Sequence, residues 1–142
     1  MKSRPATKGA WDRGAWIVED EPAVASLAVD LCIERGATPS VFRSSVTFMA
    51  ALREGPPPAV VILDWRLENE LSAAVFMATR HRYPRLPIVY WTGSRADLLP
   101  SMITADPHTV VVGKSEGTTA FEEALIAALD GERDEPGSLP AV

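Results

Sequence analysis

Five short, nearly continuous apolar runs alternate with helical patterns along this chain of 142 residues, and this alternation restricts the fold more than any other feature. The runs lack the apolar–polar alternation of a half-exposed strand, which indicates strands covered on both faces. Strands that alternate with helices predict an open, parallel α/β sheet with helices on both sides. The runs are Ala15–Val18, Val41–Phe42, Val60–Leu63, Ile88–Trp91 and Val110–Val112.

Helical patterns fill the intervals between these runs. Pro22 is placed to open the first helix and Gly36 to stop it, whereas Pro100 weakens the fourth. The last pattern opens with the capping-box spacing Thr119-x-x-Glu122. The other helices are expected at about 45–54, 71–82 and 96–104. The apolar positions are Val24, Leu27, Ala28 and Leu31 in the first pattern, and Phe121, Leu125, Ile126 and Leu129, which we expect to be buried, in the last.

Length and composition predict a single domain with a substantial core, over residues 15–130, flanked by tails at 1–14 and 131–142. The net charge of -5 argues against a nucleic-acid partner. The four basic residues of the first tail read as solvated, with a phosphate or lipid contact as the alternative. No apolar stretch suits a membrane span or a signal peptide, so we expect a cytoplasmic protein without membrane contact. Cys32 has no disulfide partner and is expected to be a packed core thiol.

Polar residues stand where four of the strands end. Because ligands of open parallel sheets bind beyond the carboxyl ends of the strands, these residues would meet at one edge if their strands are neighbours. Acids at 19, 20 and 64 would repel one another unless a cation lay among them, and hard oxygen donors suit Mg²⁺ best. The strand ends are Glu19-Asp20-Glu21, Asp64, Thr92-Gly93 and Gly113-Lys114-Ser115.

Asp64 is the residue at these ends that is hardest to explain as an ordinary surface group. A charge directly after Val-Val-Ile-Leu is costly unless it is paired. Beside a cation, the ionised carboxylate could attack a phosphoryl group, and Mg²⁺, Lys114 and Thr92 could each hold a phosphoryl oxygen. Each remaining residue also has a plainer reading: the acids before Pro22 as a helix cap, Thr92 as a turn residue and Lys114 as a solvated lysine.

The stretches IVEDEP, VVILDWRL, PIVYWTG and VVGKS resemble response-regulator receiver domains, the CheY-like modules of bacterial two-component signalling, over about residues 15–130. The resemblance implies a flavodoxin-like (βα)5 doubly wound sandwich around a five-stranded parallel sheet. It implies that Asp64 is the phosphoacceptor, Thr92 the switch hydroxyl and Lys114 the phosphate-pairing lysine. It also implies a Mg²⁺ site formed by the carboxylates of Asp20 and Asp64, by the backbone carbonyl of Arg66 and, through water, by Glu19.

The implied function is that of a single-domain response regulator. A sensor histidine kinase or a phosphotransfer protein would phosphorylate Asp64, and the regulator would signal by binding a downstream protein that the sequence does not identify. Its only catalysis would be its own phosphorylation and dephosphorylation, so it is not expected to be an enzyme in the ordinary sense. Thr92 would move toward the phosphoryl group and bias the surface formed by the fourth helix, the fifth strand and the fifth helix. A homodimer is left open.

Four features depart from the family pattern. They are Val111 in place of an aromatic, Ser115 in place of a proline, the loop ENELS without the usual proline and glycine, and Pro100 in the fourth helix. These departures leave a second hypothesis open, a pseudo-receiver that binds proteins without phosphorylation. A phosphatase commonly needs a second acid two residues after the nucleophile, where Arg66 stands, and a flavodoxin-like FMN site would place its phosphate against acidic residues 19–21, so both are disfavoured.

Overall fold

The computed structural model describes residues 13–67 and 70–131. Its central sheet has five parallel strands in the order β2-β1-β3-β6-β7. Because β4 and β5 belong to a separate two-stranded sheet, the five strands counted along the chain have the order 2-1-3-4-5. This is the strand order of flavodoxin-like folds, and it confirms the predicted doubly wound α/β sandwich. The strands are β1 (Gly14–Val18), β2 (Thr38–Phe42), β3 (Val60–Leu63), β6 (Ile88–Thr92) and β7 (Thr109–Gly113).

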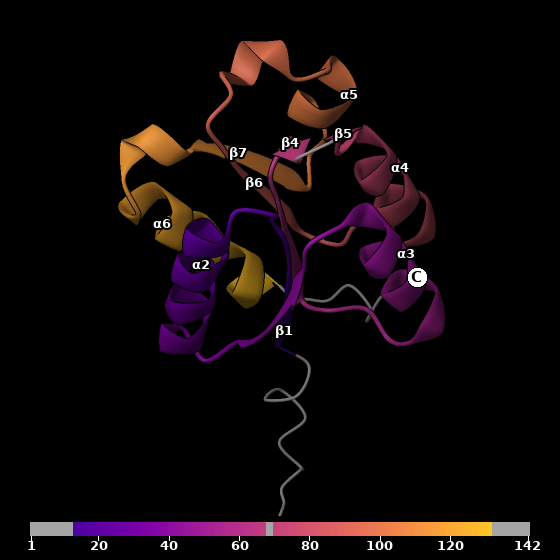
Figure 1. Ribbon diagram of the computed structural model, residues 1–142, viewed down its shortest axis with the longest axis horizontal. Coiled ribbons are helices and arrows are strands. Elements are labelled where there is room, and N and C mark those ends of the chain that lie inside the picture. The colour runs from indigo at the N-terminus through magenta and orange to yellow at the C-terminus, as the bar shows by residue number, and fades with distance from the viewer. Residues whose placement is uncertain (1–12, 68–69, 132–142) are drawn as a thin grey trace, which may run out of the picture.

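Helices cover both faces of this sheet (Figure 1). Helices α2 (Pro22–Glu34) and α6 (Thr119–Gly131) form one apolar core with the strands. Helices α3 (Ser45–Glu54), α4 (Ala73–Arg82) and α5 (Ser101–Thr104) form the other. Every residue of β3 and β6 is buried, because both strands lie inside the sheet and are covered from both sides.

The edge strand β2 is longer than expected. It begins at Thr38 rather than at Val41, and it pairs with β1 from Thr38 opposite Gly14 to Phe42 opposite Val18. Its first three residues are Thr, Pro and Ser, which do not form an apolar run. An edge strand is covered less than a central one, so backbone pairing holds it without an apolar sequence.

Two predicted helices are wrong in their bounds. The third begins at Ala73 and not at Leu71, because Glu70–Leu71 form a short strand, β5, antiparallel to β4 (Arg66–Leu67). The fourth is reduced to a 3-10 turn, η2 (Ala96–Leu98), and the single-turn α5. Pro100 separates the two pieces and caps α5, since proline lacks the amide proton that a continuous helix would use.

The last helix is placed as expected, but its capping differs. It begins at Thr119, and the Glu122 amide donates to the Thr118 carbonyl at 2.8 Å, so Thr119 lies inside the helix and is not the N-cap of the predicted capping box. In α6, Phe121, Leu125 and Leu129 are buried as predicted, whereas Ile126 is only half-buried. Leu27 of α2 is 40% exposed, although its position fits the apolar pattern.

Cys32 is fully buried in α2, which confirms the predicted core thiol. Burial raises the pKa of the thiol to about 12, so the reactive thiolate is rare at neutral pH. No helix in the described ranges has the length and apolar character needed to cross a membrane.

Candidate functional site

Two carboxylates and one ammonium group meet at the carboxyl edge of the sheet. Glu19 follows β1, Asp64 follows β3, and Lys114 follows β7 as the first residue of the 3-10 turn η3 (Lys114–Glu116). The Nζ atom of Lys114 lies 2.9 Å from Oδ2 of Asp64 and 3.3 Å from Oε1 of Glu19. Three of the residues that the sequence predicted for a site are therefore in direct contact.

Backbone hydrogen bonds fix both acids just beyond the strands. The Glu19 amide donates to the Phe42 carbonyl at 3.1 Å, and the Asp64 amide donates to the Val18 carbonyl at 3.3 Å. The parallel ladder thus continues one residue past β1 and β3. Both acids are buried at this edge, because Glu19 is only 5% exposed and Asp64 only 7% exposed.

The electrostatics of this cluster depend on Lys114. Burial and the charge of Asp64 raise the pKa of Glu19, while Lys114 and the Glu21 amide, which donates to Oε2 of Glu19 at 3.2 Å, act in the opposite direction. Burial alone would lower the pKa of Lys114, but its hydrogen bond and charge pairing with Asp64, together with Glu19, raise it above its ordinary value. Lys114 is therefore held as an ammonium ion between two carboxylates.

Thr92 ends β6 and lies between the strands of Asp64 and Lys114. It is 1% exposed and pairs in register with Gly113, the residue before Lys114. Its Oγ1 accepts a hydrogen bond from the Ser94 amide at 3.1 Å. Because the Ser94 amide is the donor in that bond, the proton of the Thr92 hydroxyl remains for another acceptor.

Asp20 and Arg66 lie beside the cluster without joining it. Asp20 follows Glu19 and is half-buried, and Arg66 is exposed in β4. Within residues 13–67 and 70–131, neither side chain forms a hydrogen bond or ion pair with Asp64 or Lys114. The structure therefore brings Glu19, Asp64 and Lys114 together and leaves Asp20, Arg66 and Thr92 as neighbours at the same edge.

The charges at this edge fit a hard dication. Three carboxylates at 19, 20 and 64 against the one ammonium of Lys114 leave two negative charges, and their oxygens are the donors that Mg²⁺ prefers. No three acidic, histidine or cysteine side chains in the described ranges converge at the spacing of metal ligands. A magnesium ion would accordingly take part of its coordination from water and backbone carbonyls, and it would share Asp64 with Lys114.

A second polar pair, which the sequence patterns did not predict, lies next to this edge. Tyr90 in β6 is fully buried, and its hydroxyl accepts a hydrogen bond from Oγ of the fully buried Ser72 at 3.2 Å. The Tyr90 ring lies 6.4 Å from the ring of Trp65, the residue directly after Asp64. The available signal was a phenol within an otherwise apolar buried run, because such a hydroxyl needs a partner.

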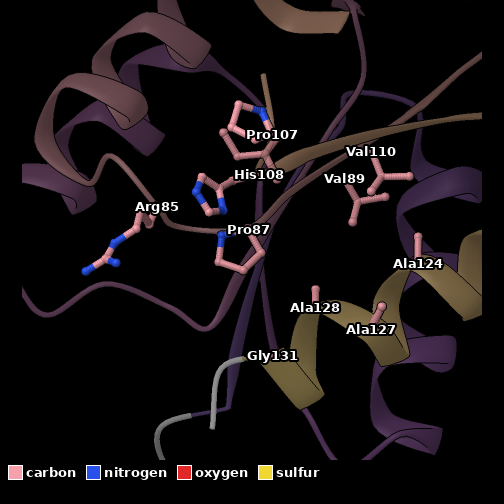
Figure 2. Close-up of a pocket in the computed structure, with 11 residues that line it drawn as sticks. Arg85, Pro87, Val89, Pro107, His108, Val110, Ala124, Ala127, Ala128 and Gly131 are labelled. Atoms are coloured by element: carbon pink, nitrogen blue, oxygen red, sulfur yellow. The ribbon is translucent and has the colours of Figure 1, made fainter. Parts of the chain in front are cut away.

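A separate pocket lies at the opposite end of the sheet. Figure 2 shows it between the start of β6, the start of β7 and the small side chains of α6, with Val89 and Val110 facing Ala124. It is a mostly apolar cavity of about 380 Å³, with Arg85 and His108 as its charged or titratable members. None of the predicted site residues lines it, so it is not part of the cluster around Asp64.

The sequence matches no protein-family model and no curated protein. Solved structures do match. A response regulator receiver protein from Sinorhizobium medicae WSM419 is 18% identical, covers 83% of this chain and 94% of its own, and has a TM-score of 0.71. The response regulator TrrA from Thermotoga maritima, in complex with Mg²⁺-BeF, is 20% identical, covers 82% of this chain and 98% of its own, and has a TM-score of 0.69.

The signal receiver domain of an HD domain-containing protein from Pseudomonas fluorescens Pf-5 gives 16% identity, 89% and 93% coverage, and a TM-score of 0.76. Identities this low establish similarity of fold rather than of activity. The three matches each extend over most of both chains. This chain therefore has the fold of response-regulator receiver domains, as its four sequence stretches implied.

Proposed function

We propose that this chain is a phosphoacceptor receiver domain whose Asp64 takes a phosphoryl group from a sensor histidine kinase or a phosphotransfer protein. The observation that carries the proposal is the contact of Lys114 with both Asp64 and Glu19 at the carboxyl edge of the sheet. In open α/β sheets this edge is where ligands bind. A carboxylate held there beside a fixed ammonium is suited to receive a group that brings additional negative charge.

The proposed transfer is a nucleophilic displacement at phosphorus. An oxygen of Asp64 forms a bond to phosphorus while the bond from phosphorus to the donor's imidazole nitrogen breaks, and that nitrogen keeps the electron pair. The product is an acyl phosphate on Asp64. Lys114, which contacts Oδ2 in the unmodified protein, would then pair with a phosphoryl oxygen, and Thr92 would donate its free hydroxyl proton to another.

Glu19, Asp20, Asp64 and the Arg66 carbonyl are the groups we propose for a magnesium ion, with Glu19 acting through water. When bound, the ion supplies charge neutralisation at the phosphoryl oxygens. Burial and the negative charge of Asp64 raise the pKa of Glu19, which is the effect that a nearby cation would relieve. The charge balance of this edge supports the same proposal.

Formation of an acyl phosphate tests this function. The protein is incubated with Mg²⁺ and acetyl phosphate, and intact mass is measured before and after treatment with hydroxylamine, which cleaves acyl phosphates. We expect one added phosphoryl group on the wild type, none on Asp64→Asn and none after chelation of the metal. An unmodified wild type, or equal modification of Asp64→Asn, contradicts the proposal.

A binding module that works without phosphorylation is the second candidate. It is favoured by the side of the molecule near α5, where the predicted fourth helix is reduced to a 3-10 turn and one helical turn. Val111, where the family usually has an aromatic residue, is half-buried and carries no polar side-chain atom. If the chain is such a module, wild type and Asp64→Asn should bind the physiological partner with equal affinity. If Asp64 is the phosphoacceptor, the variant should no longer respond to the kinase.

The output of the phosphoacceptor would be a protein–protein interaction. The partner is a downstream protein, with a second copy of the chain as the alternative. Sedimentation of the protein with and without acetyl phosphate distinguishes the two, because only self-association changes the mass of the isolated chain. We propose further that residues 15–130 form the receiver domain, with residues 1–14 and 131–142 as tails on either side of it.

A further inference from the structure

The fully buried ring of Tyr90 packs near both Trp65, the residue after Asp64, and Phe76 in α4. The ring of Tyr90 lies 6.4 Å from that of Trp65, with an interplanar angle of 62°. It lies 6.4 Å from the ring of Phe76 in α4, at an angle of 41°. Tyr90 therefore contacts both the residue after Asp64 and the helix α4 that follows β5.

Ser72 completes the connection. Its hydroxyl donates to the Tyr90 hydroxyl, and its amide donates to the Trp65 carbonyl at 3.0 Å. Its carbonyl accepts the Phe76 amide at 3.0 Å, which makes Ser72 the N-cap position of α4. All three polar groups of this buried residue are thus engaged, with Asp64's neighbour, with α4 and with Tyr90.

Tyr90 also occupies a specific register in the sheet. It pairs with Val111 of β7, so a hydroxyl is present in β6 and absent from the directly opposite position in β7. Both side chains belong to the same apolar core. Of the two paired residues, only Tyr90 therefore places a polar side-chain group in this core.

We propose that Tyr90 is a positioning residue whose hydroxyl, bonded to Ser72, transmits a change of charge at Asp64 to the paired strands β4 and β5 and to the first turn of α4. This inference rests on the proposed function, because phosphorylation is the change of charge that we expect at Asp64. The surface that responds to phosphorylation would then lie at α4 rather than on the face formed by α5, β7 and α6.

Hydrogen-bond accounting gives the physical reason. Ser72 is the donor in its bond to Tyr90, so the phenol proton of Tyr90 is available to another acceptor. Burial raises the pKa of the phenol, the bond to Ser72 lowers it, and the charge of Asp64 raises it further, so Tyr90 and Asp64 interact electrostatically. A different charge at Asp64 changes where the phenol proton points, and Ser72 must then adjust, because a buried hydroxyl without a partner is costly.

A double-mutant cycle tests this coupling without any need for phosphorylation. Backbone amide shifts of Ser72 and Ala73 are measured by NMR in wild type, Asp64→Asn, Tyr90→Phe and the double variant. Tyr90→Phe keeps the ring and removes only the hydroxyl. We expect the shift caused by Asp64→Asn to fall at least threefold when Tyr90 is Phe, and an unchanged shift overturns the proposal.

Two further variants make the outcome specific. In Val111→Ala, at the paired position in β7, Asp64→Asn should cause the same amide shifts as in the wild type. Loss of these shifts in Val111→Ala would overturn the proposal. If Tyr90→Phe does not fold, Ser72→Ala replaces it in the cycle, with the Ala73 amide as the readout and the same expected decrease. Acetyl phosphate and Mg²⁺ are added in a separate arm: an unmodified wild type refutes the proposed function, whereas the cycle still decides the coupling between Asp64 and Tyr90.

Discussion

Lys114 donates a hydrogen bond to Asp64 at 2.9 Å across 50 residues of sequence. The same ammonium group lies 3.3 Å from Glu19. The contact is possible because β1, β3 and β7 are parallel and end at the same edge of the sheet. Lys114 thus separates two buried carboxylates that would otherwise face each other, and its removal should affect both stability and signalling.

Lys114→Ala should retain the fold and lose stability, by roughly 1 to 3 kcal/mol at pH 8, because it leaves two buried carboxylates unpaired. The loss should be smaller at pH 5. The pKa of Glu19 is already raised by burial and by Asp64, so a fall in pH protonates Glu19 and relieves the repulsion. Urea unfolding at both pH values checks this, with the exposed Arg95→Ala as a control, and a loss independent of pH contradicts it.

We also expect Lys114→Ala to uncouple phosphorylation from partner binding.

Glu19→Gln should stabilise the protein at pH 7, by up to about 1 kcal/mol. The folded-state pKa of Glu19 is raised above its ordinary value of 4.5, so its charged form opposes folding at any pH above the folded pKa. This cost disappears as the pH falls through the raised pKa toward 4.5, and the advantage of the variant should disappear with it. Thermal unfolding between pH 4 and 8 measures the effect, and Glu21→Gln, at an exposed position, serves as the matched control. A variant less stable than wild type at pH 7 would show that the bond to Lys114 outweighs burial.

Intrinsic fluorescence should report binding of Mg²⁺ or of a phosphoryl mimic. Trp65 adjoins Asp64 and Trp91 adjoins Thr92, and both are buried. Trp91 stacks on Phe121 at 4.3 Å, so a shift at the strand end changes its surroundings directly. We expect the spectral change to decrease in Trp65→Phe and to persist in Trp16→Phe, whose ring packs against Phe42 and Phe48 instead. An unchanged wild-type spectrum at saturating Mg²⁺ would argue against a site at these strand ends.

Arg80→Ala should destabilise the fold by roughly 2 to 4 kcal/mol, because it removes a largely buried cation from several partners at once. Its guanidinium donates to the carbonyls of Tyr83 and Leu86 at 3.0 and 2.8 Å and to Oδ2 of Asp106 at 2.8 Å. These bonds tie the end of α4 to the loop before β7. Denaturant unfolding measures the loss, and Arg82→Ala, at an exposed position two residues away, should cost little. Equal losses in the two variants would contradict this assignment.

The alternation of apolar runs and helical patterns was sufficient to predict the sheet and its five strands. Buried strands must be apolar on both faces, so β3 and β6 can be recognised in the sequence as continuous apolar runs. Because parallel strands end at the same edge of a sheet, the polar residues directly after the apolar runs can be assigned to that edge. Glu19, Asp64 and Lys114 are predicted there for this reason. Thr38–Ser40 of β2 and the β4–β5 pair could not be predicted, because backbone pairing at an exposed edge leaves no hydrophobic pattern.

The order of the elements and the types of residue at the carboxyl edge could be predicted from the sequence, since both depend on local composition. The contacts among those residues could not be predicted in this way. Lys114 contacts Asp64 and Glu19 while Asp20 stays apart, and Tyr90 and Ser72 form a hydrogen bond in the core beside them. These outcomes depend on strand order and register across segments far apart in the chain. Such long-range pairings have no local signal, because each is fixed by how the whole sheet packs between its helices.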